Sequence, residues 1–340
     1  MRRAAELAGR GRFTTLPNPV VGCVVLDPDG AVVGEGWHER AGQPHAEVVA
    51  LAMAGSRGRG GTAVVTLSPC THHGRTGPCT QALVEAGVRR VVVGVADPWP
   101  PAAGAAQVLR AAGVEVEIGV EAEAAEQANR VWLTAVRRES PYVTWKVATS
   151  LDGRVAAADG TSRWITGEQA RADVHLLRAE CDAVLVGVGT VLADDPALTV
   201  RPADGSAGER QPLRVVADTT GRTPASARVR DAEADSWVAT AAELGTAADG
   251  RVDLVALLRG LYTRGRRHVL LEGGPRLAGA MVAAGLVDRV VAYLAPALLG
   301  SGPASLEGGG VGTLADAHRL ELVDVRQVGT DVRIEARPVP

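Results

Sequence analysis

Residues 44–79 read PHAEVVALAMAGSRGRGGTAVVTLSPCTHHGRTGPC, and their pattern indicates the fold of the first half of the chain. The spacing of apolar residues predicts a helix over Ala46–Ala54, a buried strand over Ala63–Leu67 and a second helix over Cys79–Glu85. Short Val, Leu and Ala runs bounded by Gly, Pro or Asp alternate with helical segments along the rest of the chain. This alternation predicts an α/β fold.

The same alternation extends to both ends of the chain. Further strands are expected at Val20–Leu26, Arg90–Val95, Glu115–Gly119, Tyr142–Ala148, Ala183–Gly187, Leu213–Ala217, Ser236–Ala239, His268–Leu271 and Arg289–Leu294, and within Leu320–Val328 and Asp331–Ala336. Further helices are expected at Ala105–Ala111, Glu121–Arg138, Gln169–Arg178, Val252–Tyr262 and Arg276–Ala284. Surface loops are expected at Ala203–Gln211, Ala241–Asp249 and Ser301–Gly312.

A chain of 340 residues exceeds what one hydrophobic core usually serves, so we expect two domains. The pair Ser140-Pro141 interrupts the pattern between a polar helix and a new strand. We therefore predict domains over residues 1–139 and 140–340.

Composition excludes several classes of function. The chain is 46% hydrophobic and 22% charged, without an apolar run of the roughly 18 residues that a membrane span needs. Its net charge is −3 and its aromatic content 3%, which removes the electrostatic basis for nonspecific nucleic-acid binding. Residues 1–6 lack the apolar stretch of a signal peptide, and four cysteines are too few for a disulfide scaffold. We expect a cytoplasmic protein that binds neither membrane nor nucleic acid.

His45, Cys70 and Cys79 form the first candidate site. One imidazole and two thiolates give zinc three protein ligands and leave the fourth position open, as in catalytic sites. Such a site lowers the pKa of a bound water from 15.7 to about 7. A proline precedes each ligand, as is common at the start of a helix. The free amides and the dipole of a helix N-terminus stabilise a thiolate over a thiol. In an alternative, His72 or His73 takes the place of His45 and the zinc is structural.

Glu47 lies two residues after His45 and so points to a different side at the start of the helix. It can take a proton from water and deliver it to a leaving amine without binding the metal. The order His-x-Glu, then Pro-Cys, then Cys is typical of zinc nucleobase deaminases, although eight residues rather than two separate the cysteines here. Those residues, 71–78, include two histidines and an arginine, which favours an anionic, phosphorylated substrate.

Lys146 is the single lysine among 36 basic residues. This indicates a function that needs a compact ammonium group able to lose its proton, which arginine cannot replace. Alternation places Lys146 on one face of its strand with Thr144 and Ala148. The turn Glu272-Gly273-Gly274-Pro275 ends a strand and begins a helix, where bare amides can hold a cofactor phosphate. No Gly-x-Gly-x-x-Gly motif follows the first strand of either half, so a Rossmann domain is not supported.

Several motifs together resemble the bifunctional riboflavin-biosynthesis deaminase/reductase family. In the first half they are Phe13-Thr14-Thr15, residues 17–22 (PNPVVG), Gly34-Glu35-Gly36, His45-Ala46-Glu47 and residues 69–76 (PCTHHGRT). In the second half they are residues 148–154 (ATSLDGR), 162–166 (SRWIT), 189–201 (GTVLADDPALTVR) and 272–275 (EGGP). The long spacing between Cys70 and Cys79 is also typical of this family.

The resemblance implies a cytidine-deaminase-like αβα domain followed by a dihydrofolate-reductase-like domain, with Zn²⁺ and NADPH as cofactors. It implies zinc ligation by His45, Cys70 and Cys79, proton transfer by Glu47, and contact of Asn18 with the substrate base. The implied NADPH contacts are Ala148, Trp164, Thr190, Asp194, Thr219, Gly273 and Gly274. The implied substrate contacts in the reductase are Ser162, Arg178, Leu198, Arg201 and Glu272.

Charge supports part of this assignment, because Arg178 and Arg201 can hold a ribose 5-phosphate by paired hydrogen bonds. Lys146 is expected to orient or protonate the sugar oxygen during reduction. No residue that would read the 2′-phosphate of NADPH, and so exclude NADH, can be identified from the sequence. Three loop positions depart from the family pattern: Trp99 replaces an asparagine, Ala102–Gln107 lacks Gly-Lys-Gly, and Gly77 replaces a proline. The chain also starts inside the first expected helix, which predicts either a misassigned start or a weakened first helix.

The expected function is deamination of 2,5-diamino-6-(5-phosphoribosylamino)pyrimidin-4-one, followed by NADPH-dependent reduction of its ribosyl chain to ribityl. The resemblance also allows a homo-oligomer through the reductase domain. One alternative is a zinc nucleoside or tRNA deaminase with an inactive second domain. Another is a nucleic-acid-binding module in which the zinc is structural.

Overall fold

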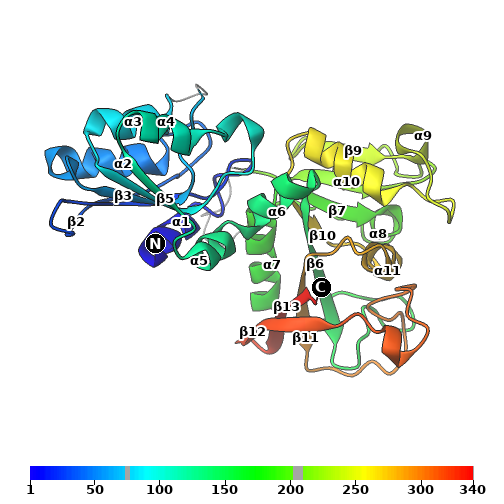
Figure 1. The fold of residues 1–340 in the computed structure, drawn as a ribbon. Helices are drawn as coiled ribbons and strands as arrows, with labels where there is room; N and C mark the ends of the chain where they lie inside the picture. Colours follow the sequence, from blue (N-terminus) through cyan, green and yellow to red (C-terminus); the bar gives the residue numbers. More distant parts are fainter. Residues whose placement is uncertain (73–76, 202–209, 340) are drawn as a thin grey trace. The chain divides into compact units, whose positions relative to one another are not determined.

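The chain forms two compact units, Met1–Glu139 and Ser140–Pro340 (Figure 1). The computed structural model describes residues 1–72, 77–201 and 210–339. Ser140 and Pro141, where the sequence pattern breaks, begin the second unit. Each unit has its own sheet and its own hydrophobic clusters.

The first unit is built on a five-stranded sheet of order β2-β1-β3-β4-β5. β1 pairs antiparallel with β2 and β3, and β3, β4 and β5 run parallel. Its strands are β1 (Gly22–Leu26), β2 (Val32–Trp37), β3 (Thr62–Leu67), β4 (Arg90–Val95) and β5 (Glu115–Ile118). Its helices are α1 (Arg2–Gly9), α2 (Ala46–Ala54), η1 (Gly55–Gly58), α3 (Cys79–Ala86), η2 (Pro100–Ala102), α4 (Ala105–Ala111), α5 (Ala122–Ala128) and α6 (Arg130–Arg138).

Helices cover both faces of this sheet because its strands carry apolar residues on both sides. One set of strand residues packs on α2, α3 and α4: Cys23, Val25, Ala63, Val65, Val91 and Val93. The alternate set, Val24, Val64 and Val92, packs on α1 on the other side (Figure 1). The result is the three-layer αβα arrangement that the sequence predicted.

The second unit is built on an eight-stranded sheet of order β12-β13-β11-β6-β10-β7-β8-β9, parallel from β11 to β9. Its strands are β6 (Tyr142–Ser150), β7 (Ala183–Gly187), β8 (Leu213–Ala217), β9 (Ser236–Ala239), β10 (His268–Leu271), β11 (Arg289–Ala295), β12 (Leu320–Val328) and β13 (Asp331–Pro338). Its helices are α7 (Glu168–Glu180), α8 (Val188–Asp194), η3 (Arg228–Arg230), α9 (Ala241–Leu244), α10 (Leu254–Thr263), α11 (Pro275–Ala283) and η4 (Leu314–Asp316).

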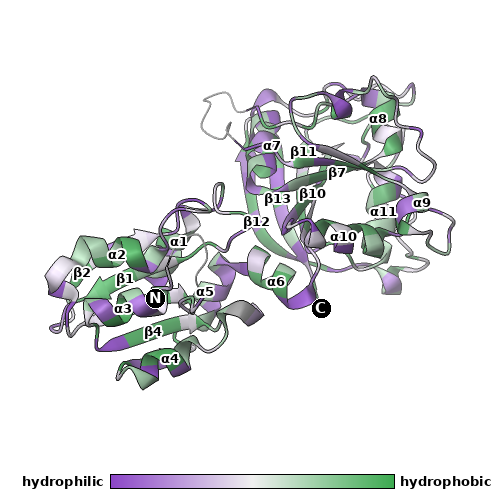
Figure 2. Cartoon of the chain, turned by 90° about the horizontal axis from the view of Figure 1, so that it is seen from above, coloured by the Kyte–Doolittle hydropathy of each residue, from purple (hydrophilic) through white to green (hydrophobic). Residues whose placement is uncertain are grey.

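Helices again lie on both faces of the sheet, with α10 and α11 on one side and α7 and α8 on the other. Val143 and Trp145 of β6 pack on the α10–α11 side, whereas Ala148 packs on the α7–α8 side. This confirms the predicted alternation and places Lys146 on the face that α7 covers. In Figure 2 the inner strands β4 and β7 are drawn mostly in the hydrophobic colour, as their burial on both faces requires.

Some elements differ from the sequence expectation. β2, α8 and the short α9 were not expected, and α9 occupies part of the loop predicted at Ala241–Asp249. The single helix predicted over Glu121–Arg138 is two helices that meet at Asn129, whose side chain accepts a hydrogen bond from the Val20 amide at 3.2 Å. The first helix, α1, spans Arg2–Gly9 and buries Ala4 and Leu7 fully.

Two further expectations concern loops and membrane segments. Most of the loop predicted at Ala203–Gln211 lies outside the described residues. The segment Ser301–Gly312 forms no helix or strand, as predicted. Within the described part of the chain, every helix is too short or too polar to cross a bilayer.

Candidate functional site

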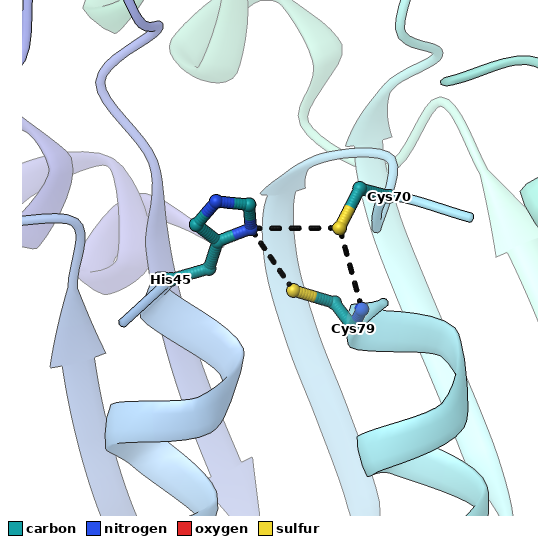
Figure 3. Close-up of side chains that lie close together, drawn as sticks. All are labelled: His45, Cys70 and Cys79. Carbon is teal, nitrogen blue, oxygen red and sulfur yellow. Dashed lines mark hydrogen bonds between the residues drawn. The ribbon is translucent and has the colours of Figure 1, made fainter. Parts of the chain in front are cut away.

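Three side chains that could hold a metal ion, those of His45, Cys70 and Cys79, converge in the first unit (Figure 3). The Nδ1 atom of His45 lies 3.2 Å from Cys79 Sγ and 3.5 Å from Cys70 Sγ. The three ligand atoms all lie within 4.8 Å of one another. One imidazole and two sulfurs are the donor set of catalytic zinc, so these residues fit the metal. His72 is not part of the group, and His73 lies outside the described residues.

Two helix starts position these ligands. His45 is the N-cap of α2, and Cys79 is the first residue of α3. Strand β2 packs directly on α2, because a Cβ on Gly36 would lie 2.4 Å from the Ala46 carbonyl oxygen. The amide of Cys79 donates to Cys70 Sγ at 3.3 Å, so the α3 N-terminus stabilises negative charge on that sulfur.

The electrostatics of this cluster suit a metal. The hydrogen bond with Cys79 and the neighbouring His45 lower the pKa of the Cys70 thiol, and the same Cys79–Cys70 bond raises the pKa of Cys79. Zinc binds cysteine as thiolate, so metal binding releases the protons of these sulfurs. Glu47 is only 3% exposed in the first turn of α2, and burial raises its pKa. A buried carboxyl group beside the ligands, but not among them, is suited to carry a proton.

Asn18, predicted to contact the base, is held by a histidine that the sequence analysis missed. His38 Nδ1 lies 3.2 Å from the Pro44 carbonyl oxygen and must therefore donate to it. Burial lowers the pKa of His38, so the ring is neutral and its Nε2 accepts from Asn18 Nδ2 at 3.1 Å. The contact orients the Asn18 amide so that its Oδ1 remains the acceptor. In the sequence, the position of His38 seven residues before His45 could have indicated that it belongs to this site.

The loop after Cys70 carries a second group of polar side chains. The His72 ring lies edge-on to Trp99, with centroids 5.2 Å apart, and His72 Nδ1 is buried without a hydrogen-bond partner among the described residues. Burial raises the pKa of nearby Asp97 to about 6. Trp99, one of the positions that depart from the expected pattern, therefore packs against His72. Arg75, predicted to face the substrate, lies outside the described residues.

Lys146, Arg178 and Glu272 meet on the α7 face of the second sheet. Arg178 Nε and Nη2 donate to the two oxygens of Glu272 at 2.6 and 3.0 Å, and both side chains are nearly buried. Leu271 pairs with Trp145, so the next residues, Glu272 and Lys146, are neighbours on adjacent strands. Burial lowers the pKa of Lys146, and the charge of Glu272 opposes that shift. Burial raises the pKa of Glu272, but Arg178 outweighs it and the net pKa is lowered.

Arg178 and Arg201, the two predicted ligands of the substrate phosphate, differ in how many of their hydrogen-bond donors are free. Arg178 is already committed to Glu272 and to the Thr199 carbonyl oxygen at 3.0 Å, which leaves two of its five N–H donors. Arg201 is exposed, and its amide donates to His175 Nδ1 at 3.1 Å. His175, which the sequence analysis did not identify, thus fixes the backbone that carries Arg201. The Leu198 side chain is 2% exposed, so only its backbone can face a ligand.

The predicted cofactor residues lie at the C-terminal ends of β6, β10, β7 and β8 and in the loop before α7. A Cβ on Gly274 would lie 3.6 Å from Thr190 Oγ1, so the Thr190 hydroxyl lies close to the start of α11. The free backbone amides of a helix start, together with a nearby hydroxyl, are suited to bind a phosphate. Thr219 Oγ1 accepts from the Val252 amide at 3.2 Å. Ala148 is half-buried beside Lys146.

Trp164 lines an open pocket of about 470 Å³ near the C-terminal end of β11. Its ring is 68% exposed, with the Arg171 guanidinium carbon 4.5 Å from its centroid. The Asp194 carbonyl accepts from Arg163 at 2.5 Å, and Ser162 is half-buried beside that arginine.

Comparison with known families covers both units. The profile of the cytidine and deoxycytidylate deaminase zinc-binding region matches residues 1–95, and that of the RibD C-terminal domain matches residues 141–334. The chain belongs to the RibD family. Riboflavin biosynthesis protein RibD of Escherichia coli K12 is 46% identical over 98% of this chain and 96% of its own length. The RibD of Mycobacterium tuberculosis H37Rv is 48% identical over 98% of this chain and 94% of its own.

Solved structures of RibD proteins have the same fold over the whole chain. RibD of Acinetobacter baumannii superimposes with a TM-score of 0.88 at 41% identity, covering 100% of this chain and 98% of its own. The deaminase/reductase of Thermotoga maritima superimposes with a TM-score of 0.86 at 35% identity, covering 100% and 97%. The chain is a zinc-dependent deaminase joined to an NADPH-dependent reductase, which confirms the predicted family, fold class and cofactors. The alternative of a deaminase with an inactive second domain is not supported, because the RibD profile spans that domain.

Proposed function

We propose that this enzyme deaminates 2,5-diamino-6-(5-phosphoribosylamino)pyrimidin-4-one in the unit 1–139 and reduces the product's ribosyl chain in the unit 140–340. The observation that carries the proposal is the convergence of His45, Cys70 and Cys79 on one point, with Glu47 buried beside them. The solved Thermotoga maritima relative is described as a deaminase and reductase of these phosphoribosylaminopyrimidines.

In the deamination, His45, Cys70 and Cys79 hold zinc, which when bound supplies a Lewis acid that activates water. Glu47 accepts the proton of the attacking water and passes it to the leaving ammonia. Asn18, oriented by His38, presents its carbonyl oxygen to an N–H group of the substrate base. The buried Nδ1 of His72 offers a further polar contact to the substrate.

In the reduction, NADPH when bound supplies hydride to C1 of the sugar. Lys146 orients or protonates the sugar oxygen as the ring opens, and Glu272 keeps its charge balanced. Arg201 and the remaining donors of Arg178 hold the substrate phosphate, with Ser162 and the Leu198 backbone at the same site. Ala148, Trp164, Thr190, Asp194, Thr219, Gly273 and Gly274 contact the coenzyme.

We also infer a homo-oligomer through the second unit and a cytoplasmic location, without a membrane or nucleic-acid partner. β12 supports the oligomer, because it is a sheet-edge strand in which Leu322 is 65% and Val325 54% exposed. A long exposed edge strand with apolar side chains is a template for pairing with a strand of another chain.

The test uses the full-length enzyme with the diaminopyrimidine substrate. We expect about one zinc per chain by metal analysis, ammonia release from the substrate, and NADPH oxidation only after deamination. A chelator that strips the zinc should stop ammonia release but leave oxidation of NADPH with the deaminated substrate. Ammonia release from a metal-free protein, or no activity on this substrate, would overturn the proposal.

A further inference from the structure

Residues 197–201 carry two of the proposed substrate contacts, the Leu198 backbone and the Arg201 side chain, yet they belong to no helix or strand. Residues 197–200 are each at most 3% exposed. A buried segment of this kind must satisfy its backbone N–H and C=O groups with partners outside a strand ladder. Side chains from other parts of the second unit provide those partners, and they determine where Arg201 is held.

Gln211, which lies two residues before β8, forms two hydrogen bonds with the backbone of Val200. The Val200 amide donates to Gln211 Oε1 at 2.8 Å, and Gln211 Nε2 donates to the Val200 carbonyl oxygen at 3.1 Å. Directly opposed residues of an antiparallel strand pair exchange the same two bonds between their backbones. The side-chain amide of Gln211 therefore takes the place of a neighbouring strand at Val200.

Two side chains on successive turns of α7 hold the residues on either side of Val200. Arg178 donates to the Thr199 carbonyl oxygen at 3.0 Å. His175 Nδ1 accepts a hydrogen bond from the Arg201 amide at 3.1 Å. Helix α7 thus binds the segment just before and just after the point that Gln211 binds.

Two consecutive peptide groups are fixed by these contacts. A trans peptide group is planar, and its C=O and N–H point in opposite directions. The Thr199–Val200 peptide is held at its oxygen from α7 and at its N–H by Gln211. The Val200–Arg201 peptide is held at its oxygen by Gln211 and at its N–H from α7. Gln211 is common to both, so without it each peptide keeps one contact and can rotate about it.

This geometry bears on the substrate because Arg178 and Arg201 are the two proposed ligands of its phosphate. Arg178 is fixed by its two hydrogen bonds to Glu272. Arg201 is exposed and is placed through its backbone. Guanidinium groups bind a phosphate by paired hydrogen bonds that require a matching direction. Rotation of the backbone at Arg201 would therefore weaken phosphate binding without altering Lys146.

We propose, on the basis of the reductase half of the proposed function, that Gln211 is a positioning residue that sets Arg201 in place to bind the substrate phosphate together with Arg178. A primary amide suits this role because it offers a donor and an acceptor at once. Glutamate lacks the donor for the Val200 carbonyl oxygen, and methionine lacks both groups.

The test measures steady-state NADPH oxidation by the full-length enzyme at varied concentrations of the deaminated substrate. Gln211→Met removes both hydrogen bonds and keeps the side-chain length, so KM should rise about tenfold while kcat changes by less than about twofold. Gln211→Glu, which keeps the acceptor, should raise KM by a smaller factor and serves as the second variant if the methionine variant does not fold. Gln127→Met, which removes an exposed bond to Glu123 in the first unit, is the control and should change neither constant.

A double-mutant cycle with Arg201→Gln separates positioning from a general structural role. Arg201→Gln should itself raise KM, and adding Gln211→Met should raise it by less than about twofold more, because Gln211 acts through Arg201. That pattern supports the assignment.

Three results would overturn the assignment while the reductase function stands. They are an unchanged KM in Gln211→Met, a fall in kcat alone, and the same tenfold rise in KM when Arg201 is already replaced. An unaltered KM in Arg201→Gln would remove Arg201 from the phosphate site, and the role of Gln211 with it. If the unaltered enzyme does not reduce the deaminated substrate, the reductase function itself fails.

Discussion

The two sites of this enzyme are assembled in different ways. In the first unit the metal ligands come from two helix starts and one strand end within residues 45–79, so neighbouring elements bring them together. In the second unit Arg178 and Glu272 are 94 positions apart and meet because α7 lies over β6 and β10. The first site can be recognised as a motif, whereas the second exists only as a consequence of the sheet.

The charges of the two sites differ for the same reason. The first holds Glu47 and two sulfurs whose charge a divalent metal balances. The second needs no metal to pair its carboxylate, since Glu272 is nearly buried beside two cations, Arg178 and Lys146. Damage to one site should therefore leave the other intact, and the following variants test that separation.

The largest effect is expected from Glu47→Gln. Without a carboxylate to move the proton, ammonia release should fall about 10²- to 10⁴-fold, while NADPH oxidation with the deaminated substrate is unchanged. Both rates and the zinc content are measured on the same preparation. Loss of both activities with zinc still bound would contradict two independent sites.

Glu272→Gln should destabilise the second unit by about 3–5 kcal/mol at pH 7, because it leaves the buried Arg178 charge unpaired. The control is Glu126→Gln, which breaks the exposed Arg137–Glu126 pair and should cost at most about 1 kcal/mol. The folded-state pKa of Glu272 is lowered, so its stabilisation is present above the unfolded pKa of about 4.3 and is lost as pH falls further. Urea unfolding at several pH values should show the two proteins converge in acid; a constant difference would refute this origin.

Lys146→Arg should lower the reduction rate about 100-fold and leave ammonia release unchanged. Arginine keeps the positive charge but cannot give up a proton or occupy the compact space of an ammonium group. The rate of NADPH oxidation with the deaminated substrate is the measurement. An unchanged rate would mean that Lys146 is an ordinary strand residue.

The smallest effect is expected from His38→Phe, which keeps the ring packed near His45 but removes its hydrogen bonds to Asn18 and Pro44. Because the Asn18 amide is then no longer held in one orientation, we expect the KM for deamination to rise about fivefold with little change in kcat. The reduction should be unaffected. A fall in kcat without a change in KM would show that His38 does not act through substrate binding.

Local patterns predicted most of the elements, and the failures have physical reasons. β4, β7 and β8 are short Val-, Leu- and Ala-rich runs, interrupted only by Arg90 and Arg214, and their predicted bounds agree with the structure. β2 was missed because Gly34 and Gly36 break its alternation, and those glycines are needed where the strand packs against α2. The predicted helix over Glu121–Arg138 divides at Asn129 because that side chain bonds to the distant Val20 amide.

The residue types of the zinc site, their order and their helix starts were readable along the chain, since each depends on a few neighbouring residues. The pairing of Arg178 with Glu272 and the support of Asn18 by His38 were not readable in this way. These depend on which strands become neighbours and which helix covers them. That choice is made by burial of the whole apolar surface at once, and no local segment encodes it.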